Sequence, residues 1–170
     1  MNRAVFIDRD GVLNIDKGYV YAKDDFEFTR NAPEAIRLLN HAGYQVIVIS
    51  NQSGVGRGFY TEEDIAQLHH YVQLELANYG ARIDGFYYCP HHPKDMCDCR
   101  KPSPKLVLQA ALDFGIDLTA SWFIGDKESD ILCAVNAETT PVYVGDKECQ
   151  CVAKTDFYDA VIYILEYCKY

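Results

Sequence analysis

The chain lacks any long apolar run. None of its 170 residues belongs to a segment approaching the roughly 18 consecutive apolar residues that a membrane-spanning helix requires. The apolar stretch near its start, AVFI, is also too short for the core of a secretory signal peptide. We therefore expect a cytoplasmic protein that has no membrane partner.

Basic charge is scarce as well. Lysine and arginine together number 16 against 25 aspartates and glutamates, so the formal net charge is −9. An acidic protein without a basic stripe is repelled by a phosphate backbone at long range. We therefore expect no nucleic-acid partner, and any anionic ligand must be held by a local cluster of cations.

The cysteine pattern contains no Cys-x-x-Cys pair, which argues against a redox motif. Seven cysteines, an odd number, in a chain for which we expect no signal peptide also argue against a disulfide framework. Four of them, Cys133, Cys149, Cys151 and Cys168, are expected to be isolated buried thiols. A chain of 170 residues can bury a hydrophobic core without disulfide bonds, and no linker or repeat interrupts it. Residues 1–170 are therefore predicted to form a single domain.

Short apolar runs alternate with segments of helical periodicity along the whole chain. Runs that are apolar on both faces are typical of buried parallel strands, and strands alternating with helices predict an α/β fold whose mostly parallel sheet has helices on both faces. The predicted strands are 4–8, 45–50, 85–89, 122–126 and 141–144, and the predicted helices are 33–41, 61–79, 103–114, 129–137 and 156–170.

Polar motifs follow the predicted strands, at the sheet edge where α/β proteins bind ligands. DRDG follows the first strand, SNQSG the second and GDKESD the fourth. Asp8, Asp10 and Asp126 would meet there, and carboxylates so close together require a cation or a shared proton. Oxygen ligands of this kind suit Mg²⁺. The alternative for any one of these residues is a solvated turn-forming aspartate.

The segment CPHHPKDMCDCRKP follows the third strand and offers three sulfurs and an imidazole. Four such ligands complete the tetrahedral coordination of a structural Zn²⁺ and leave no position for a reactive water. The metal would instead fix a small loop that ends in Arg100 and Lys101. His92 is an alternative to the histidine in this ligand set. The predicted zinc ligands are Cys89, His91, Cys97 and Cys99.

The motifs DRDGVLN, SNQSG, RKP and GDKESD, in this order at successive strand ends, resemble those of the haloacid dehalogenase-like phosphatase superfamily. The resemblance covers nearly the whole chain. It implies a Rossmann-like three-layer sandwich. Neither the interval between Asn14 and Phe28 nor the one after Ser50 can hold a large cap domain, so none is expected.

The same resemblance implies a two-step phosphoryl transfer. Asp8 would be the nucleophile, and Asp10 would be the general acid and then the general base. Ser50 and the amide groups of Asn51 would bind the phosphoryl oxygens, and Lys101 would supply a fixed positive charge. The implied Mg²⁺ ligands are Asp8, the backbone carbonyl of Asp10, and Asp126.

Two assignments carry alternatives. Lys105 is the runner-up for the catalytic lysine, because it opens a predicted helix. Asp130 would orient its neighbours or, equally, would be an ordinary carboxylate on a helix surface.

Within the superfamily, the motifs are similar to those of heptose bisphosphate phosphatases, and a related family, the histidinol-phosphate phosphatases, shares the zinc loop. The short spacing between His91 and Cys97 is common in the second family.

We expect a monomer acting on a small sugar phosphate; a non-catalytic phosphate-binding module is a further alternative. Arg57 is a candidate to hold a second phosphate or, equally, a solvated surface charge. The residues expected to bind substrate are Asp16, Lys17, Gly18, Tyr19, Asn51, Gln52, Ser53, Arg57, Arg100 and Lys127.

Overall fold

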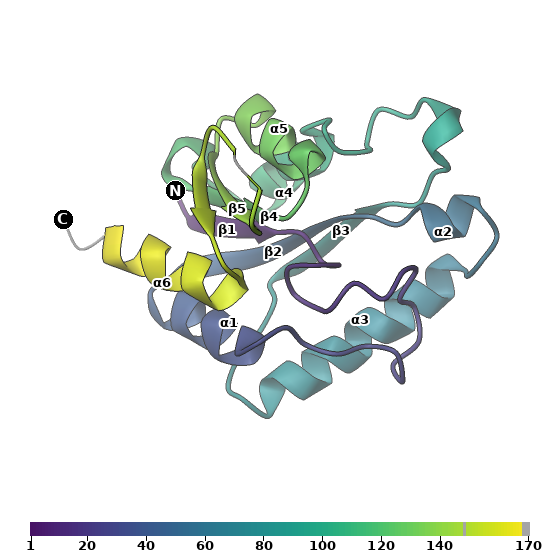
Figure 1. Ribbon diagram of the computed structural model, residues 1–170, viewed down its shortest axis with the longest axis horizontal. Helices are drawn as coiled ribbons and strands as arrows, with labels where there is room; N and C mark the ends of the chain where they lie inside the picture. The colour runs from purple at the N-terminus through teal and green to yellow at the C-terminus, as the bar shows by residue number, and fades with distance from the viewer. Residues whose placement is uncertain (148, 168–170) are drawn as a thin grey trace.

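The computed structural model describes residues 1–147 and 149–167, and these are built around one six-stranded parallel sheet (Figure 1). Its strand order is β3-β2-β1-β4-β5-β6, and each neighbouring pair runs parallel. The strands are β1 (Arg3–Ile7), β2 (Tyr44–Asn51), β3 (Gly85–Cys89), β4 (Trp122–Gly125), β5 (Thr140–Val144) and β6 (Val152–Lys154).

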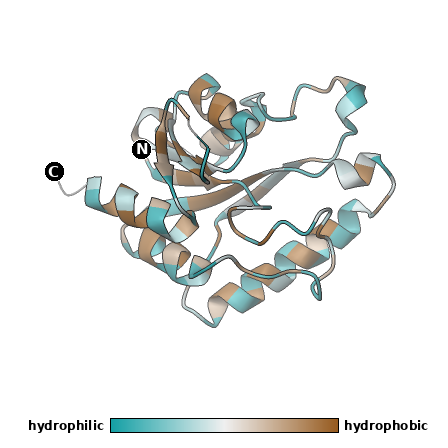
Figure 2. Cartoon of the chain, viewed as in Figure 1, coloured by the Kyte–Doolittle hydropathy of each residue, from teal (hydrophilic) through white to brown (hydrophobic). Residues whose placement is uncertain are grey.

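Helices cover both faces of this sheet, as the alternating sequence pattern predicts. One buried cluster joins the sheet to α1 (Ala32–His41), α3 (Glu62–Ala77) and α6 (Phe157–Tyr167). A second cluster, on the opposite face, joins it to α4 (Lys105–Phe114) and α5 (Glu128–Asn136). In Figure 2 the central strands are mostly brown, which agrees with burial on both sides. The predicted three-layer α/β sandwich is therefore confirmed.

The register of the central strands places the polar motifs together. Ile7 at the end of β1 pairs with Val48 on one side and with Ile124 on the other. The residues that follow these three positions therefore emerge at the same edge of the sheet, because parallel strands end on the same side.

Four elements are absent from the sequence prediction: β6, α2 and two short 3-10 helices, η1 (Pro93–Asp95) and η2 (Leu118–Ala120). The edge strand β6 has three residues, none of them fully buried, so it carries no apolar run that would reveal it. The glycine-rich segment after β2 forms a single helical turn, α2 (Ser53–Gly56). Among residues 1–147 and 149–167, no helix has both the length and the apolar character needed to cross a bilayer.

Candidate active site

Three of the four predicted catalytic residues, Asp8, Asp10 and Lys101, line a small cavity of about 160 Å³ at the carboxyl edge of the sheet, whereas the fourth, Ser50, is buried outside this lining. Asp8 directly follows β1, Asn51 ends β2, and Asp130 lies in the first turn of α5. The cavity is lined by Asp8, Asp10, Asn51, Arg100, Lys101, Lys127, Ser129 and Asp130.

Lys101 is a buried cation that pairs with two carboxylates of this site. Its Nζ lies 2.8 Å from Oδ1 of Asp8 and 2.7 Å from Oδ1 of Asp130, and it donates a 2.7 Å hydrogen bond to the carbonyl of Ile49. Burial disfavours the charge, but these two carboxylates outweigh burial and raise the pKa of Lys101 above its ordinary value. Lys105, the runner-up, instead pairs with Asp98 at the surface, so the structure brings Lys101 and not Lys105 to Asp8.

Asp130 is fully buried, so the alternative of a helix-surface carboxylate is wrong. Its Oδ2 accepts hydrogen bonds from the backbone amides of Asp126 (3.2 Å) and Lys127 (3.1 Å). Burial and the nearby Asp8 raise the pKa of Asp130, while the ion pair with Lys101 opposes that rise. Asp130 thus fixes the turn that carries Asp126 and also neutralises part of the charge of Lys101.

A cluster of carboxylates lies beside this pair. Oxygens of Asp8, Asp126 and Asp130 lie within 4.8 Å of one another, close enough to share a metal ion. Burial and the charge of Asp8 raise the pKa of Asp126 to about 7. The Nζ of Lys127 lies 3.7 Å from Oδ2 of Asp8, 3.4 Å from Oδ1 of Asp126 and 3.3 Å from the carbonyl oxygen of Asp10. One ammonium group thus contacts all three oxygen groups predicted to hold Mg²⁺.

Gly11 allows Asp126 to approach the first strand. Its φ is +93°, and a Cβ at this position would lie 2.1 Å from Oδ2 of Asp126. Any side chain here would displace the third carboxylate, which explains in physical terms why glycine follows Asp10.

Asp10 is held at both carboxylate oxygens. Oδ1 accepts hydrogen bonds from Arg9 (2.9 Å) and Asn14 (3.0 Å), and Oδ2 accepts one from Nε2 of Gln52 (3.0 Å). Burial raises the pKa of Asp10, but the Arg9 guanidinium and these hydrogen bonds outweigh burial and lower it. The structure thus holds Asp10 as a carboxylate.

Sequence reasoning assigned no role to Arg9, Asn14 or Tyr60. Arg9 and Asn14 are both fully buried, and the available signal was that they flank Asp10 within DRDGVLN. The hydroxyl of Tyr60 donates a 2.7 Å hydrogen bond to Oε1 of Gln52, a contact that no sequence motif indicates.

Asn51 and Arg100 join the loop that carries the cysteine and histidine cluster to the cavity. The backbone amide of Lys101 donates to Oδ1 of Asn51 (3.0 Å), and the Asn51 amide nitrogen donates to the Lys101 carbonyl (3.3 Å). Arg100 lines the cavity, and its buried Nη1 has no hydrogen-bond partner within the described residues. An unsatisfied buried donor of this kind is a natural partner for an anion.

The predicted substrate-binding residues in segments 16–19 and 53–57 lie outside the cavity lining. The Nζ of Lys127 is 3.7 Å from Asp16, whose Oδ1 accepts from the amide of Gly18. Tyr19 packs edge-on against Phe59 with ring centroids 4.9 Å apart. The remaining positions lie outside the cavity lining: Lys17 pairs with Glu27 at the surface, Ser53 begins α2, and Arg57 is exposed.

The predicted zinc ligands form a second cluster, in the loop after β3. The ligand atoms of Cys89, His91, Cys97 and Cys99 all lie within 4.8 Å of one another. Nδ1 of His91 is 3.2 Å from Sγ of Cys99 and 3.6 Å from Sγ of Cys89. His92 lies outside this group, because its Nδ1 accepts a hydrogen bond from the amide of Lys94.

The other cysteines depart in part from the expectation of isolated buried thiols. Cys133 is buried and donates to the carbonyl of Ser103. Cys149 and Cys151 are half-buried with their sulfurs 2.6 Å apart, so the expectation is wrong for this pair. Cys168 lies outside the described residues.

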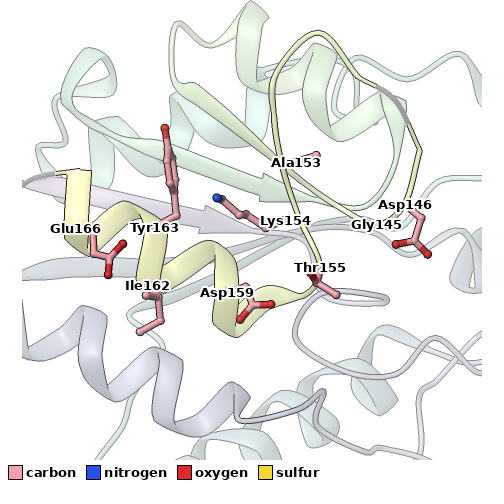
Figure 3. Close-up of a pocket in the computed structure, with 9 residues that line it drawn as sticks. All are labelled: Gly145, Asp146, Ala153, Lys154, Thr155, Asp159, Ile162, Tyr163 and Glu166. Atoms are coloured by element: carbon pink, nitrogen blue, oxygen red, sulfur yellow. The ribbon is translucent and has the colours of Figure 1, made fainter.

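Figure 3 shows a hollow of about 510 Å³ beside α6, lined by residues from the β5–β6 segment and from that helix. Its charged side chains include Asp146, Asp159, Glu166 and Lys154, and the Nζ of Lys154 lies 4.3 Å from the ring centroid of Tyr163. No predicted catalytic or metal-binding residue lines this hollow, so size alone does not mark the active site.

The raised pKa of Asp126 predicts a pH dependence of stability in metal-free protein. The folded state binds a proton here up to about pH 7, whereas an unfolded aspartate releases it near pH 4. The free energy of unfolding should therefore fall as pH rises through this window. Asp126→Asn lacks this titration. From pH 5 to pH 8 we therefore expect its free energy of unfolding to rise relative to that of the parent by about 1 kcal/mol or more, as measured by urea unfolding in the presence of a chelator. Asp24→Asn, at an exposed position, is the control. If the free energies of unfolding of Asp126→Asn and the parent differed by the same amount at every pH, the raised pKa of Asp126 would be contradicted.

Comparisons with known proteins identify the family of the chain. The HAD-hydrolase-like family model matches residues 98–150. A Helicobacter pylori (strain ATCC 700392 / 26695) protein named D-glycero-beta-D-manno-heptose-1,7-bisphosphate 7-phosphatase is 49% identical over 138 residues, covering 81% of this chain and 80% of that protein. The Escherichia coli (strain K12) protein of the same name is 43% identical over 141 residues, covering 79% and 74%.

A solved structure shows the same architecture. The D,D-heptose 1,7-bisphosphate phosphatase from B. bronchiseptica, complexed with magnesium and phosphate, matches with a TM-score of 0.90 and 28% identity, covering 97% of this chain and 99% of that one. Sequence identity over most of both chains and a shared fold lead to one conclusion. The chain belongs to the D-glycero-beta-D-manno-heptose-1,7-bisphosphate 7-phosphatase family of haloacid dehalogenase-like hydrolases.

Proposed function

We propose that this protein hydrolyses the 7-phosphate of D-glycero-D-manno-heptose 1,7-bisphosphate through an aspartyl-phosphate intermediate. The observation that carries the proposal is the position of Asp8, which lines the small cavity and has cations at both of its carboxylate oxygens, Lys101 at Oδ1 and Lys127 at Oδ2. Cations so placed reduce the repulsion between the carboxylate and an incoming phosphate.

In the first step, a carboxylate oxygen of Asp8 forms a bond to phosphorus and the bond from phosphorus to the sugar oxygen breaks. Asp10 transfers a proton to that leaving oxygen. Arg9, Asn14 and Gln52 favour the ionised form of Asp10, and the negative charge of a bound phosphate opposes them by raising its pKa. In the second step, Asp10 accepts a proton from water, the water oxygen attacks phosphorus, and the release of phosphate restores the carboxylate of Asp8.

The donor set fits a divalent cation. Asp8, Asp126 and the carbonyl oxygen of Asp10 already surround one ammonium group, and oxygen ligands of this kind are those that Mg²⁺ prefers. A bound Mg²⁺ would neutralise negative charge on the phosphoryl group during its transfer. The B. bronchiseptica relative was solved with magnesium and phosphate, which supports the same assignment here.

The loop cluster fits Zn²⁺. Four of the six distances between its ligand atoms run from 3.2 to 3.8 Å, and all six are within 4.8 Å. A tetrahedron with zinc–ligand bonds of about 2.1 to 2.3 Å has edges of about 3.5 to 3.8 Å. We infer that zinc holds the loop that presents Arg100 and Lys101 to the cavity.

The substrate assignment rests on the relatives, whose names specify the heptose bisphosphate. We propose that Arg57 and the segment around Tyr19 contact the sugar and its second phosphate. The short zinc loop favours the competing substrate, histidinol phosphate. Phosphate release with Mg²⁺ should show a kcat/KM for the bisphosphate at least about a hundredfold above that for histidinol phosphate. The reverse preference would assign the protein to the histidinol-phosphate reaction, and activity on neither would favour a non-catalytic module.

We expect Asp8→Asn to reduce turnover to below about one-thousandth of the parent value, because an amide cannot form the covalent intermediate. The fold should persist, since Asp130 still pairs with Lys101 and a negative charge is removed from the carboxylate cluster. Circular dichroism and kcat measure the two effects, with Asp113→Asn at the surface as the matched control. Turnover close to that of the parent would rule out Asp8 as the nucleophile.

Removing a sulfur ligand should weaken the zinc loop. Cys97→Ser is expected to lower zinc content from about one ion per chain to well under half and to lower the thermal midpoint, because structural zinc binding is coupled to folding. Cys149→Ser, outside the cluster, should change neither zinc content by elemental analysis nor the midpoint. Unchanged zinc in Cys97→Ser would exclude this cysteine as a ligand.

A further inference from the structure

The hydroxyl group of Tyr60 begins a buried chain of hydrogen bonds that ends at two predicted catalytic residues. Tyr60 donates to Oε1 of Gln52 at 2.7 Å. Nε2 of Gln52 donates to Oγ of Ser50 at 2.6 Å and to Oδ2 of Asp10 at 3.0 Å. Tyr60, Gln52 and Ser50 are each at most 6% exposed, so water does not compete freely for these bonds.

The direction of donation in this chain follows from Asp10. A carboxylate accepts hydrogen bonds and cannot donate them, so the NH₂ group of Gln52 must face Asp10. Oε1 then faces Tyr60, and the phenol must be the donor. Because Ser50 accepts from the same NH₂ group, its own hydroxyl proton is left to be donated to another acceptor, such as a phosphoryl oxygen.

The ring of Tyr60 is held rigidly in place. A Cβ on Gly54 would lie 2.1 Å from Cε1 of Tyr60, so this glycine leaves the space that the ring occupies. The ring also stacks on Tyr21, with centroids 5.0 Å apart and an interplanar angle of 17°. The hydroxyl is thus directed at Gln52 by packing that does not depend on the hydroxyl itself.

We propose that Tyr60 is a positioning residue for phosphoryl transfer. Its hydroxyl fixes the orientation of the Gln52 amide, which in turn holds Asp10 and orients Ser50. Without that donor the amide is free to rotate, and an orientation with Oε1 toward Asp10 would set two acceptors against each other. The inference rests on the proposed function, since it takes Asp10 and Ser50 to act on the phosphoryl group.

The test compares Tyr60→Phe with the parent. The change removes one oxygen and keeps the ring that packs against Gly54 and Tyr21. We expect kcat for the bisphosphate to fall about tenfold with KM changed less than about threefold, because Asp10 transfers its proton only in the transition state. Tyr87→Phe is the matched control: it removes a 2.6 Å bond from a tyrosine hydroxyl to Asp113 at the surface, and kcat should stay within about twofold.

A double-mutant cycle separates this chain from a general loss of packing. Once Gln52→Met has removed the amide, adding Tyr60→Phe should cause no further loss of kcat. A kcat for Tyr60→Phe within about twofold of the parent, or losses that multiply in the double variant, would overturn the proposal.

A readout independent of activity is the pair of Gln52 side-chain amide protons in NMR. We expect two resolved, slowly exchanging signals in the parent, and signals that shift and broaden in Tyr60→Phe but not in Tyr87→Phe. Unchanged signals in Tyr60→Phe would overturn the inference. If the parent released no phosphate from any substrate, the proposed function would fail, and this NMR comparison alone would decide the role of Tyr60.

Discussion

The buried ammonium group of Lys101 holds the active-site edge of this protein together. It pairs with Asp8 from the end of β1 and with Asp130 from α5, and it donates to the carbonyl of Ile49 in β2. Three elements that are distant in sequence are thus fixed around one charge. Removing one partner of such a buried pair is costly because it leaves a charge without compensation. Here Asp8 and Asp130 share the cation, so either carboxylate can be neutralised while Lys101 stays paired.

The same edge carries more negative charge than its lysines neutralise. Oxygens of Asp8, Asp126 and Asp130 lie within 4.8 Å of one another, and burial together with the charge of Asp8 raises the pKa of Asp126. A bound divalent cation would offset this negative charge and create the positive potential that an anionic substrate needs in an acidic protein. The loop with the cysteine and histidine cluster positions the cation of this edge. Cys99 precedes Lys101 by two residues, and Asn51 accepts a hydrogen bond from the Lys101 backbone amide. A metal in that loop would therefore act on catalysis through position and not through its own reactivity.

Much of this arrangement follows from the sequence, for identifiable reasons. The parallel sheet was predicted because its strands are apolar on both faces, and the converging motifs because parallel strands end at one edge. The edge strand β6 was missed because its three residues carry no periodic signal. Lys101 and Lys105 were hard to separate by spacing, and only the tertiary structure shows one buried on Asp8 and the other at the surface on Asp98. The contact of Tyr60 with Gln52, like the proximity of Cys149 and Cys151, depends on how loops fold back, which local propensity does not encode.

The proposed covalent role of Asp8 can be tested by trapping the aspartyl-phosphate intermediate. Protein mixed with the heptose bisphosphate and Mg²⁺, quenched in acid and reduced with sodium borohydride, should contain homoserine at position 8, because borohydride reduces an acyl phosphate to the alcohol. Peptide mass spectrometry locates the change, and protein treated without substrate is the reference. Homoserine at position 8 that depends on substrate is the predicted result. Its appearance at position 10, or its absence from an actively turning-over sample, would contradict the mechanism.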